Sequence, residues 1–248
     1  MTDDDRTSAT TGDHPTVVLV HGAFAESASW NGVIEQLTVD GYPVVAAANP
    51  LRGLADDAAQ LRSLLDRVGG PMVVVGHSYG GSVVSVAADG HPGVRALVYV
   101  GSFLLAEGES TGELAGKFPG NELGPALDPV PVSDGRGGTV TDLYIQPERF
   151  RAVFAADVAP EIAELMVATQ RPITSEALSE KATAAAWRTI PSWTLVTRQD
   201  LAVPPEAQVF MGRRAQSRIV EVDASHAVAV SRPGAVVDVI VQAARATA

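Results

Sequence analysis

The chain has 248 residues, 46% of them hydrophobic and 19% charged, so it can fill one large core and is too apolar for a disordered protein. Its formal net charge of −11 at pH 7 disfavours nucleic acid and anionic membrane surfaces as partners. The sequence has no cysteine, which excludes disulfides, thiolate metal sites and cysteine nucleophiles and fits a cytoplasmic location.

The N-terminal segment, residues 1–13, is acidic and polar. A secretory signal needs a basic start and an apolar stretch, so we expect a short disordered tail here instead. No apolar run approaches the roughly 18 residues of a membrane-spanning helix.

Short apolar runs then alternate with helical patterns, as is typical of a parallel sheet covered by helices on both faces. Strands are predicted at residues 16–20, 43–47, 72–75, 96–100, 193–196 and 218–222. Helices are predicted from about Trp30 to Gly41 and over residues 54–68, 80–88, 204–214 and 233–246. We therefore expect one α/β core, built from residues 14–102 and 188–248.

The alternation stops between residues 103 and 187. Glycine, proline and charged residues dominate 107–138, which indicates a loop, whereas 144–169 and 175–186 have helical patterns. The interruption predicts a helical cap, residues 103–187, inserted over the sheet.

The sequence Gly76-His77-Ser78-Tyr79-Gly80 matches the G-x-S-x-G pattern of a nucleophile elbow. It follows an apolar strand and opens a small-residue helix, which is the context that the motif requires. The sharp turn strains the serine backbone, leaves no room for flanking side chains and directs a helix N-terminus at a developing oxyanion. A glycine-rich turn with an incidental serine is the alternative, and this context favours Ser78 as the nucleophile.

A serine hydroxyl needs a base to take its proton. His226 directly follows the last predicted strand, and the carboxyl ends of parallel strands converge on one crevice, so His226 is the predicted base. The alternative is a loop histidine packed on the last helix. We expect His77 to point away from Ser78, His91 to be a solvated helix-end histidine, and His21 to brace the first loop through hydrogen bonds.

The base in turn needs a carboxylate, and in this arrangement the acid lies between serine and histidine along the chain. Asp200 follows the strand at 193–196 and is the predicted acid. A helix cap or a solvated loop aspartate is the alternative role for Asp200. Asp223, three residues before His226, is the rival acid.

The oxyanion needs two backbone donors, one after the nucleophile and one from the loop after the first strand. Gly22 in that loop lets the backbone approach the substrate. We predict the N–H groups of Tyr79 and Ala23 as donors, with Phe24 as the alternative to Ala23.

The segments HGAFAESASW, GHSYGG, TRQDLAVPPEAQ and DASHAV resemble a lid-bearing α/β-hydrolase. They are most similar to the compact branch that contains plant methyl esterases, hydroxynitrile lyases and many bacterial homologues, and the resemblance spans residues 16–245. It implies a six-stranded, mainly parallel sheet and neither a metal nor an organic cofactor. It also implies esterase chemistry, in which Ser78 attacks, His226 carries the proton and water releases the acid from an acyl-enzyme.

The same fold hosts other functions. Lyases of this branch typically place a lysine after the catalytic histidine and a threonine in the first loop, where this chain has Ala227 and Gly22. Perhydrolase-type members often carry methionine after the nucleophile, where this chain has Tyr79. Dehalogenases and epoxide hydrolases use aspartate at the position of Ser78. Non-catalytic hormone receptors also share the fold and can keep the triad, so the motifs alone leave a binding protein open.

Substrate choice is expected to lie in the cap. Large apolar side chains are candidates to line the pocket, with ordinary cap packing as the alternative for each: Phe24, Phe103, Leu104, Phe150, Phe154, Met166 and Trp187. The acidic residues of the cap disfavour a polyanionic substrate. We therefore expect a small, largely apolar ester, lactone or thioester, taken by a monomer or a homodimer.

Overall fold

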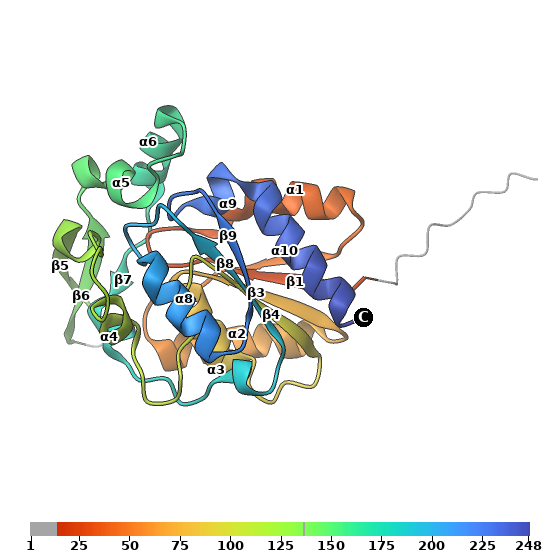
Figure 1. The fold of residues 1–248 in the computed structure, drawn as a ribbon. Coiled ribbons are helices and arrows are strands. Elements are labelled where there is room, and N and C mark those ends of the chain that lie inside the picture. Colours follow the sequence, from red (N-terminus) through yellow and green to blue (C-terminus); the bar gives the residue numbers. More distant parts are fainter. Residues whose placement is uncertain (1–13, 136) are drawn as a thin grey trace, which may run out of the picture.

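A six-stranded parallel sheet lies at the centre of the computed structural model, which describes residues 14–135 and 137–248 (Figure 1). The strands run in the order β2 (Val44–Ala47), β1 (Thr16–Val20), β3 (Met72–His77), β4 (Val94–Val100), β8 (Ser192–Thr197) and β9 (Arg218–Val222). All neighbouring pairs are parallel, which confirms the predicted sheet. The predicted tail at 1–13 lies outside the described residues.

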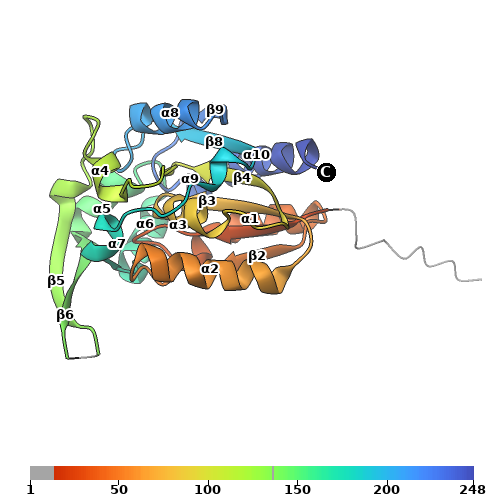
Figure 2. The ribbon, with the colours of Figure 1, turned by 90° about the horizontal axis from the view of Figure 1, so that it is seen from below.

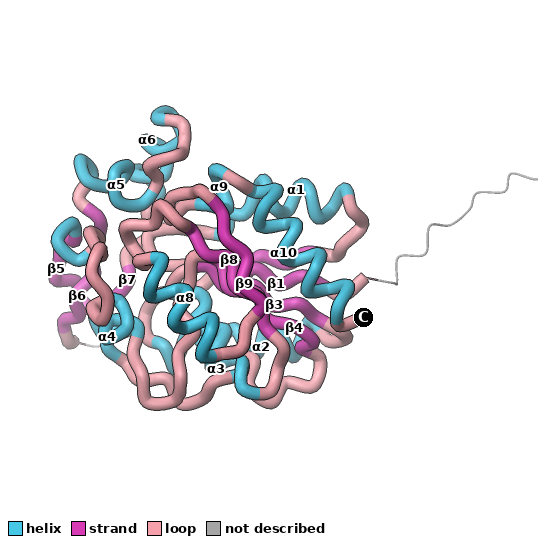
Figure 3. The backbone as a smooth tube through the Cα atoms, in the orientation of Figure 1, coloured by secondary structure: helices cyan, strands magenta, loops and turns pink. Residues whose placement is uncertain are grey.

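Helices cover both faces of this sheet (Figures 2 and 3). One face packs against α1 (Asn31–Val39) and α10 (Pro233–Ala246), and the other against α2 (Leu54–Val68), α3 (Tyr79–Ala87) and α8 (Pro205–Arg214). In β1, Val17 and Leu19 enter the first layer of core, and Val18 and Val20 the second. Burial on both faces explains why the strands are continuous runs of valine and leucine.

An insertion between β4 and β8 forms the cap, at the left of Figure 1. Its elements are α4 (Thr111–Ala115), β5 (Leu127–Ser133), β6 (Thr139–Ile145), α5 (Pro147–Phe154), α6 (Pro160–Thr169), β7 (Ile173–Thr174) and α7 (Ser175–Ser179). The last helical turn before the core strand is Ala186–Arg188, and short helical turns also occur at Ser27–Trp30, Gly124–Ala126 and α9 (Val228–Ser231).

The predicted cap helices are present, but the cap also contains strands, and the prediction of a loop over 107–138 was wrong. Strands β5, β6 and β7 form a separate antiparallel sheet, and the helix expected from residue 144 begins only at Pro147. Pro129 and Pro131 suggested a loop, but β5 is an edge strand, where a residue without an N–H donor is tolerated. The signal that was missed is the richness of Thr139–Ile145 in β-branched residues and tyrosine, which favour strands.

Polar contacts tie the cap to the core. The Arg52 guanidinium, just before α2, pairs with Asp142 of β6 at 2.6 Å and donates to the Pro172 carbonyl at 3.0 Å. Arg214 of α8 pairs with Glu109 at 2.5 Å, and this ion pair holds the pKa of the Glu109 carboxyl below its usual range, against the opposing effect of its partial burial. The cap is therefore fastened near both edges of the sheet, by a residue that follows the edge strand β2 and by one on α8, which packs against β8 and β9. In the residues that the structure describes, no helix is long and apolar enough to cross a membrane.

Candidate active site

Ser78 occupies the turn between β3 and α3 in a strained conformation. Its φ of 53° and ψ of −126° are rare for a residue with a side chain and cost on the order of 1–3 kcal/mol. A Cβ added at Gly76 would lie 2.6 Å from the Gly81 Cα, and one at Gly80 would collide with the Val20 carbonyl. The glycines flanking the serine are thus required by close backbone contacts, as the elbow motif predicts.

His226 and Asp200 meet at the carboxyl ends of the last two strands of the sheet. The Nδ1 atom of His226 lies 2.8 Å from Oδ2 of Asp200, and both side chains are fully buried. With Nδ1–H donating to the carboxylate, Nε2 is the unprotonated nitrogen and has no hydrogen-bond partner in the described part of the chain. An imidazole held in this tautomer can accept a proton at Nε2.

Four further donors fix the Asp200 carboxylate. The backbone N–H groups of Ala202 and Val203 both donate to Oδ1 at 2.8 Å. The Thr197 hydroxyl donates to Oδ2 at 2.7 Å, and the Gln208 amide donates to it at 3.1 Å. Together these hydrogen bonds fix the direction of the carboxylate toward His226.

The rival acid, Asp223, lies elsewhere. Its side chain is 66% exposed and pairs with Arg198 at 3.1 Å. Of the two candidate acids, Asp200 and Asp223, only Asp200 contacts His226. Sequence reasoning missed Thr197 and Gln208, although both lie in the same short segment as Asp200.

His77 does more than the sequence suggested. Its ring lies beside that of His226, with centroids 4.6 Å apart, and its Nε2–H donates to the His226 carbonyl at 2.9 Å. Burial, reinforced by the nearby His226, lowers the pKa of His77 to about 3, so the ring stays neutral. Sequence reasoning expected this side chain only to avoid Ser78 and did not find its contact with the base.

His21 braces the first loop, as predicted. Its Nδ1 donates to the Gly22 carbonyl at 2.9 Å, and its Nε2 accepts the Asn49 N–H at 3.1 Å. Burial lowers its pKa to about 4, which keeps it neutral for both bonds. The prediction that His91 is solvated was wrong: its side chain is 5% exposed, because the ring turns inward, accepts the Gly93 N–H at 3.0 Å and contacts Asp66.

The first loop touches the nucleophile directly. A Cβ at Gly22 would lie 2.6 Å from the Ser78 Cβ. The Phe24 N–H donates to the Arg171 carbonyl of the cap at 3.0 Å, so this donor is already engaged and Ala23 is favoured as the oxyanion donor of the loop. Tyr79 is fixed at the start of α3 because its hydroxyl donates to the buried Asp57 carboxyl at 2.8 Å.

Aromatic side chains from the cap reach the base. The Phe154 ring meets His226 edge-on at 4.8 Å between centroids, and it also contacts Phe24 at 6.3 Å and Phe150 at 5.1 Å. Phe24 and Met166 line an apolar hollow of about 350 Å³ between the first loop and α6. Five of the predicted pocket residues are core residues less than 5% exposed: Phe24, Phe103, Leu104, Phe150 and Phe154.

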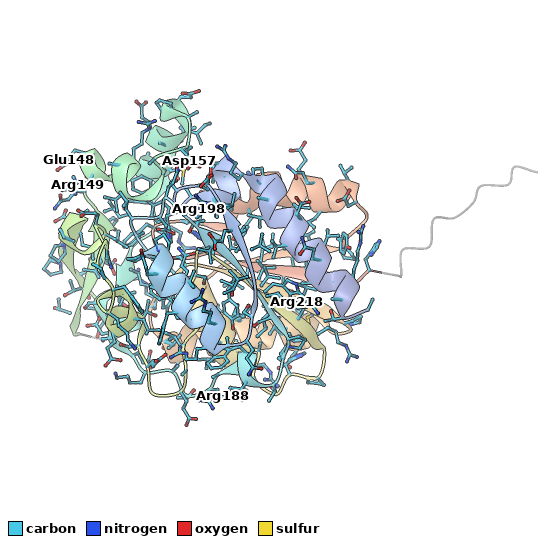
Figure 4. The ribbon with its side chains drawn as sticks, viewed as in Figure 1. Glu148, Arg149, Asp157, Arg188, Arg198 and Arg218 are labelled. Carbon is cyan, nitrogen blue, oxygen red and sulfur yellow. The ribbon has the colours of Figure 1, made fainter. Side chains whose placement is uncertain are left out.

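Trp187 is not near the base. Its indole N–H donates to the Leu105 carbonyl at 2.7 Å, and its ring lies under the guanidinium groups of Arg188 and Arg214. Figure 4 places Arg188 at the opposite end of the molecule from Asp157, which contacts the loop of His226. Trp187 was predicted for the pocket from its place in the insertion, but the chain has by then returned along α3 to the start of β8.

Residues 17–239 match the alpha/beta hydrolase family. The chain belongs to this family. It is 28% identical to the pyrethroid hydrolase of Sphingobium wenxiniae, over 94% of this chain and 88% of that protein. The crystal structure of a pyrethroid hydrolase from Sphingobium faniae superposes with a TM-score of 0.75, at 25% identity over 94% of this chain and 98% of that one.

Polyneuridine aldehyde esterase shares the fold with a TM-score of 0.79, at 16% identity over 92% of this chain and 98% of that one. The family match and these neighbours confirm the resemblance to α/β-hydrolases and the expected fold class. Within the described residues, no three histidine or carboxylate side chains gather in a group suited to a metal ion.

Proposed function

We propose that this alpha/beta hydrolase is a serine esterase that cleaves a small, largely apolar carboxylic ester through an acyl-enzyme on Ser78. The observation that carries the proposal is the buried hydrogen bond between Asp200 and His226, together with a serine held in the strained elbow. Similarity to a pyrethroid hydrolase supports hydrolysis as the reaction class.

The chemistry follows from the geometry. The Ser78 oxygen attacks the ester carbonyl carbon while Nε2 of His226 takes the hydroxyl proton, and Asp200 stabilises the imidazolium. The oxyanion accepts hydrogen bonds from the N–H groups of Tyr79 and Ala23. As the carbon–oxygen bond breaks, His226 returns the proton to the leaving alcohol, and water repeats the sequence to release the acid.

An apolar hollow beside the first loop is the candidate position for the apolar part of the substrate. The hollow beside Phe24 is lined mainly by apolar side chains, including Met166, Ile162 and Leu165 of α6. Leu165 is 63% exposed and Ile162 40% exposed, so α6 presents apolar surface at the edge of this hollow. We propose that one side of the ester lies here, and that the net charge of −11 disfavours polyanionic substrates. All three proposed catalytic residues belong to one chain, and we propose that a monomer is sufficient for turnover.

The test is the turnover of p-nitrophenyl esters by the purified protein and by Ser78→Ala. We expect serine-dependent hydrolysis, with kcat falling roughly 10³- to 10⁶-fold in the variant. A fluorophosphonate should label Ser78 in the wild-type protein and leave the variant unlabelled. Labelling at another residue, or full activity in Ser78→Ala, would refute the assignment. Labelling of Ser78 without turnover of any ester would instead support a binding protein on the same fold.

A further inference from the structure

The loop that carries His226 is held by the cap on both sides of the histidine. On one side, the Ser225 hydroxyl donates a short hydrogen bond to the Asp157 carboxylate. On the other, the Ala227 N–H donates to the Phe154 carbonyl at 2.9 Å. The ring of Phe154 packs edge-on against His226 itself. All of these cap groups come from the end of α5 and the turn that follows it.

Residues of the core hold the ring and the carbonyl oxygen of His226. Asp200 fixes the ring of His226, and His77 fixes its carbonyl oxygen. Neither contact holds the backbone of Ser225 and Ala227. The position of that backbone determines where the His226 side chain begins. Between β9 and α9 that backbone is a short irregular segment, held on the core side by the Gln199 N–H, which donates to the Ala224 carbonyl at 3.1 Å, and on the cap side by Phe154 and Asp157.

Among the described residues, Asp157 makes no other side-chain hydrogen bond or ion pair than its bond with Ser225. Its Oδ1 atom accepts the Ser225 hydrogen bond, while its Oδ2 atom is buried with no hydrogen-bond partner among residues 14–135 and 137–248. Asp157 itself is half-buried, and a carboxylate oxygen that is shielded from water and has no hydrogen-bond partner is costly to keep. Figure 4 shows Asp157 at the junction of α5 and α6 with the upper end of α9, where the cap meets the histidine loop.

We propose that Asp157 is a positioning residue for the base: by accepting the Ser225 hydrogen bond it ties the cap to the histidine loop and sets the place of the His226 Nε2 atom. This inference rests on the proposed function, in which that atom takes the Ser78 proton. A substitution in the cap can then change the rate of proton transfer to His226, even when the substituted residue does not contact the substrate. Misplacing a reacting group by 1 Å can cost about 10²-fold in rate.

The test compares Asp157→Ala and Ser225→Ala, which remove the bond, with Asp157→Asn, which keeps an acceptor for the serine hydroxyl. Glu161→Ala, a neighbouring exposed carboxylate on α6, is the matched control. We expect kcat on a p-nitrophenyl ester to fall roughly ten- to hundredfold in each alanine variant, with KM little changed. Asp157→Asn should recover most of this loss, and Glu161→Ala should match the wild type. The double alanine variant should lose no more than either single one, because both remove the same bond.

Two readouts do not depend on ester turnover. The first is the low-field proton NMR signal of the His226 Nδ1–H, which reports its bond to Asp200 and should shift or broaden in Asp157→Ala but not in Glu161→Ala. The second is the rate at which a fluorophosphonate labels Ser78, which should fall in parallel with kcat.

Unchanged kcat, labelling rate and NMR signal in folded Ser225→Ala would overturn the inference. So would a loss confined to KM and the melting temperature, which would give Asp157 a purely structural role. If the wild type labels at Ser78 but hydrolyses no ester, the proposed function fails, whereas the labelling rates and NMR signal still decide the positioning role.

Discussion

Replacing Gly22 by alanine tests how closely the first loop and the nucleophile fit together. An added Cβ would lie 2.6 Å from the Ser78 Cβ and 2.9 Å from the His77 carbonyl oxygen, whereas ordinary contacts begin at 3.4 Å. The loop or the elbow must therefore move by roughly 0.8 Å. A displacement of that size at the reacting atoms costs about 10²-fold in rate, and overpacking costs about 1–3 kcal/mol of stability.

The assay is kcat/KM on a p-nitrophenyl ester together with thermal unfolding. We expect Gly22→Ala to lose about 10²-fold in kcat/KM while still unfolding cooperatively. Gly124→Ala is the matched control, because a Cβ there meets nothing within 4 Å and activity should be unchanged. If folded Gly22→Ala kept activity within threefold of the wild type, the reasoning from close contact would be refuted.

Three further predictions concern the acid, the pH and the reaction class. Asp200→Asn should lower kcat by about 10⁴-fold, whereas Asp223→Asn should change kcat little. The reverse ranking would show that Asp223, and not Asp200, is the acid of the triad. Burial lowers the pKa of His21 to about 4 and that of His77 to about 3, from an unfolded value of 6.5. Below pH 6.5 the unfolded chain therefore binds more protons than the folded chain, and the melting temperature should fall toward pH 4. A melting temperature that stays constant over this range would contradict neutral buried rings. Ala227 offers no cation to a departing cyanide, so cyanide release from mandelonitrile should be negligible beside ester hydrolysis, and serine-dependent release exceeding hydrolysis would indicate a lyase.

The core could be predicted because its pattern is local. Within β1 and β3, residues 17–20 and 72–75 are apolar throughout, which only a strand buried on both faces requires. Asp200 and His226 were placed by their positions after strands, and the structure brings them together. In the cap the local pattern misleads, because Pro129 breaks an inner strand but is accepted in an edge strand.

Contacts between distant parts of the chain could not be predicted. His77 donates to the carbonyl of a residue 149 positions later, and the Ser225 bond to Asp157 spans 68 positions. No periodicity or motif marks such a pair, since each partner alone is an ordinary polar residue. These contacts decide how firmly the base is held, so the sequence indicated which residues meet but not what supports them.

The insertion of the cap between the adjacent strands β4 and β8 has a consequence for how the chain folds and how it can change. Leu97 to Val100 pair in register with Ser192 to Leu195, so two neighbouring strands must close a loop of roughly ninety residues. Closure entropy grows only with the logarithm of loop length, at about 0.6 kcal/mol for each doubling. The sheet therefore tolerates a long excursion at small thermodynamic cost, and lengthening or remodelling that excursion barely alters the pairing beneath it. Cap length and composition can drift while β4 and β8 stay joined, provided that the turn after α5 still reaches the histidine loop.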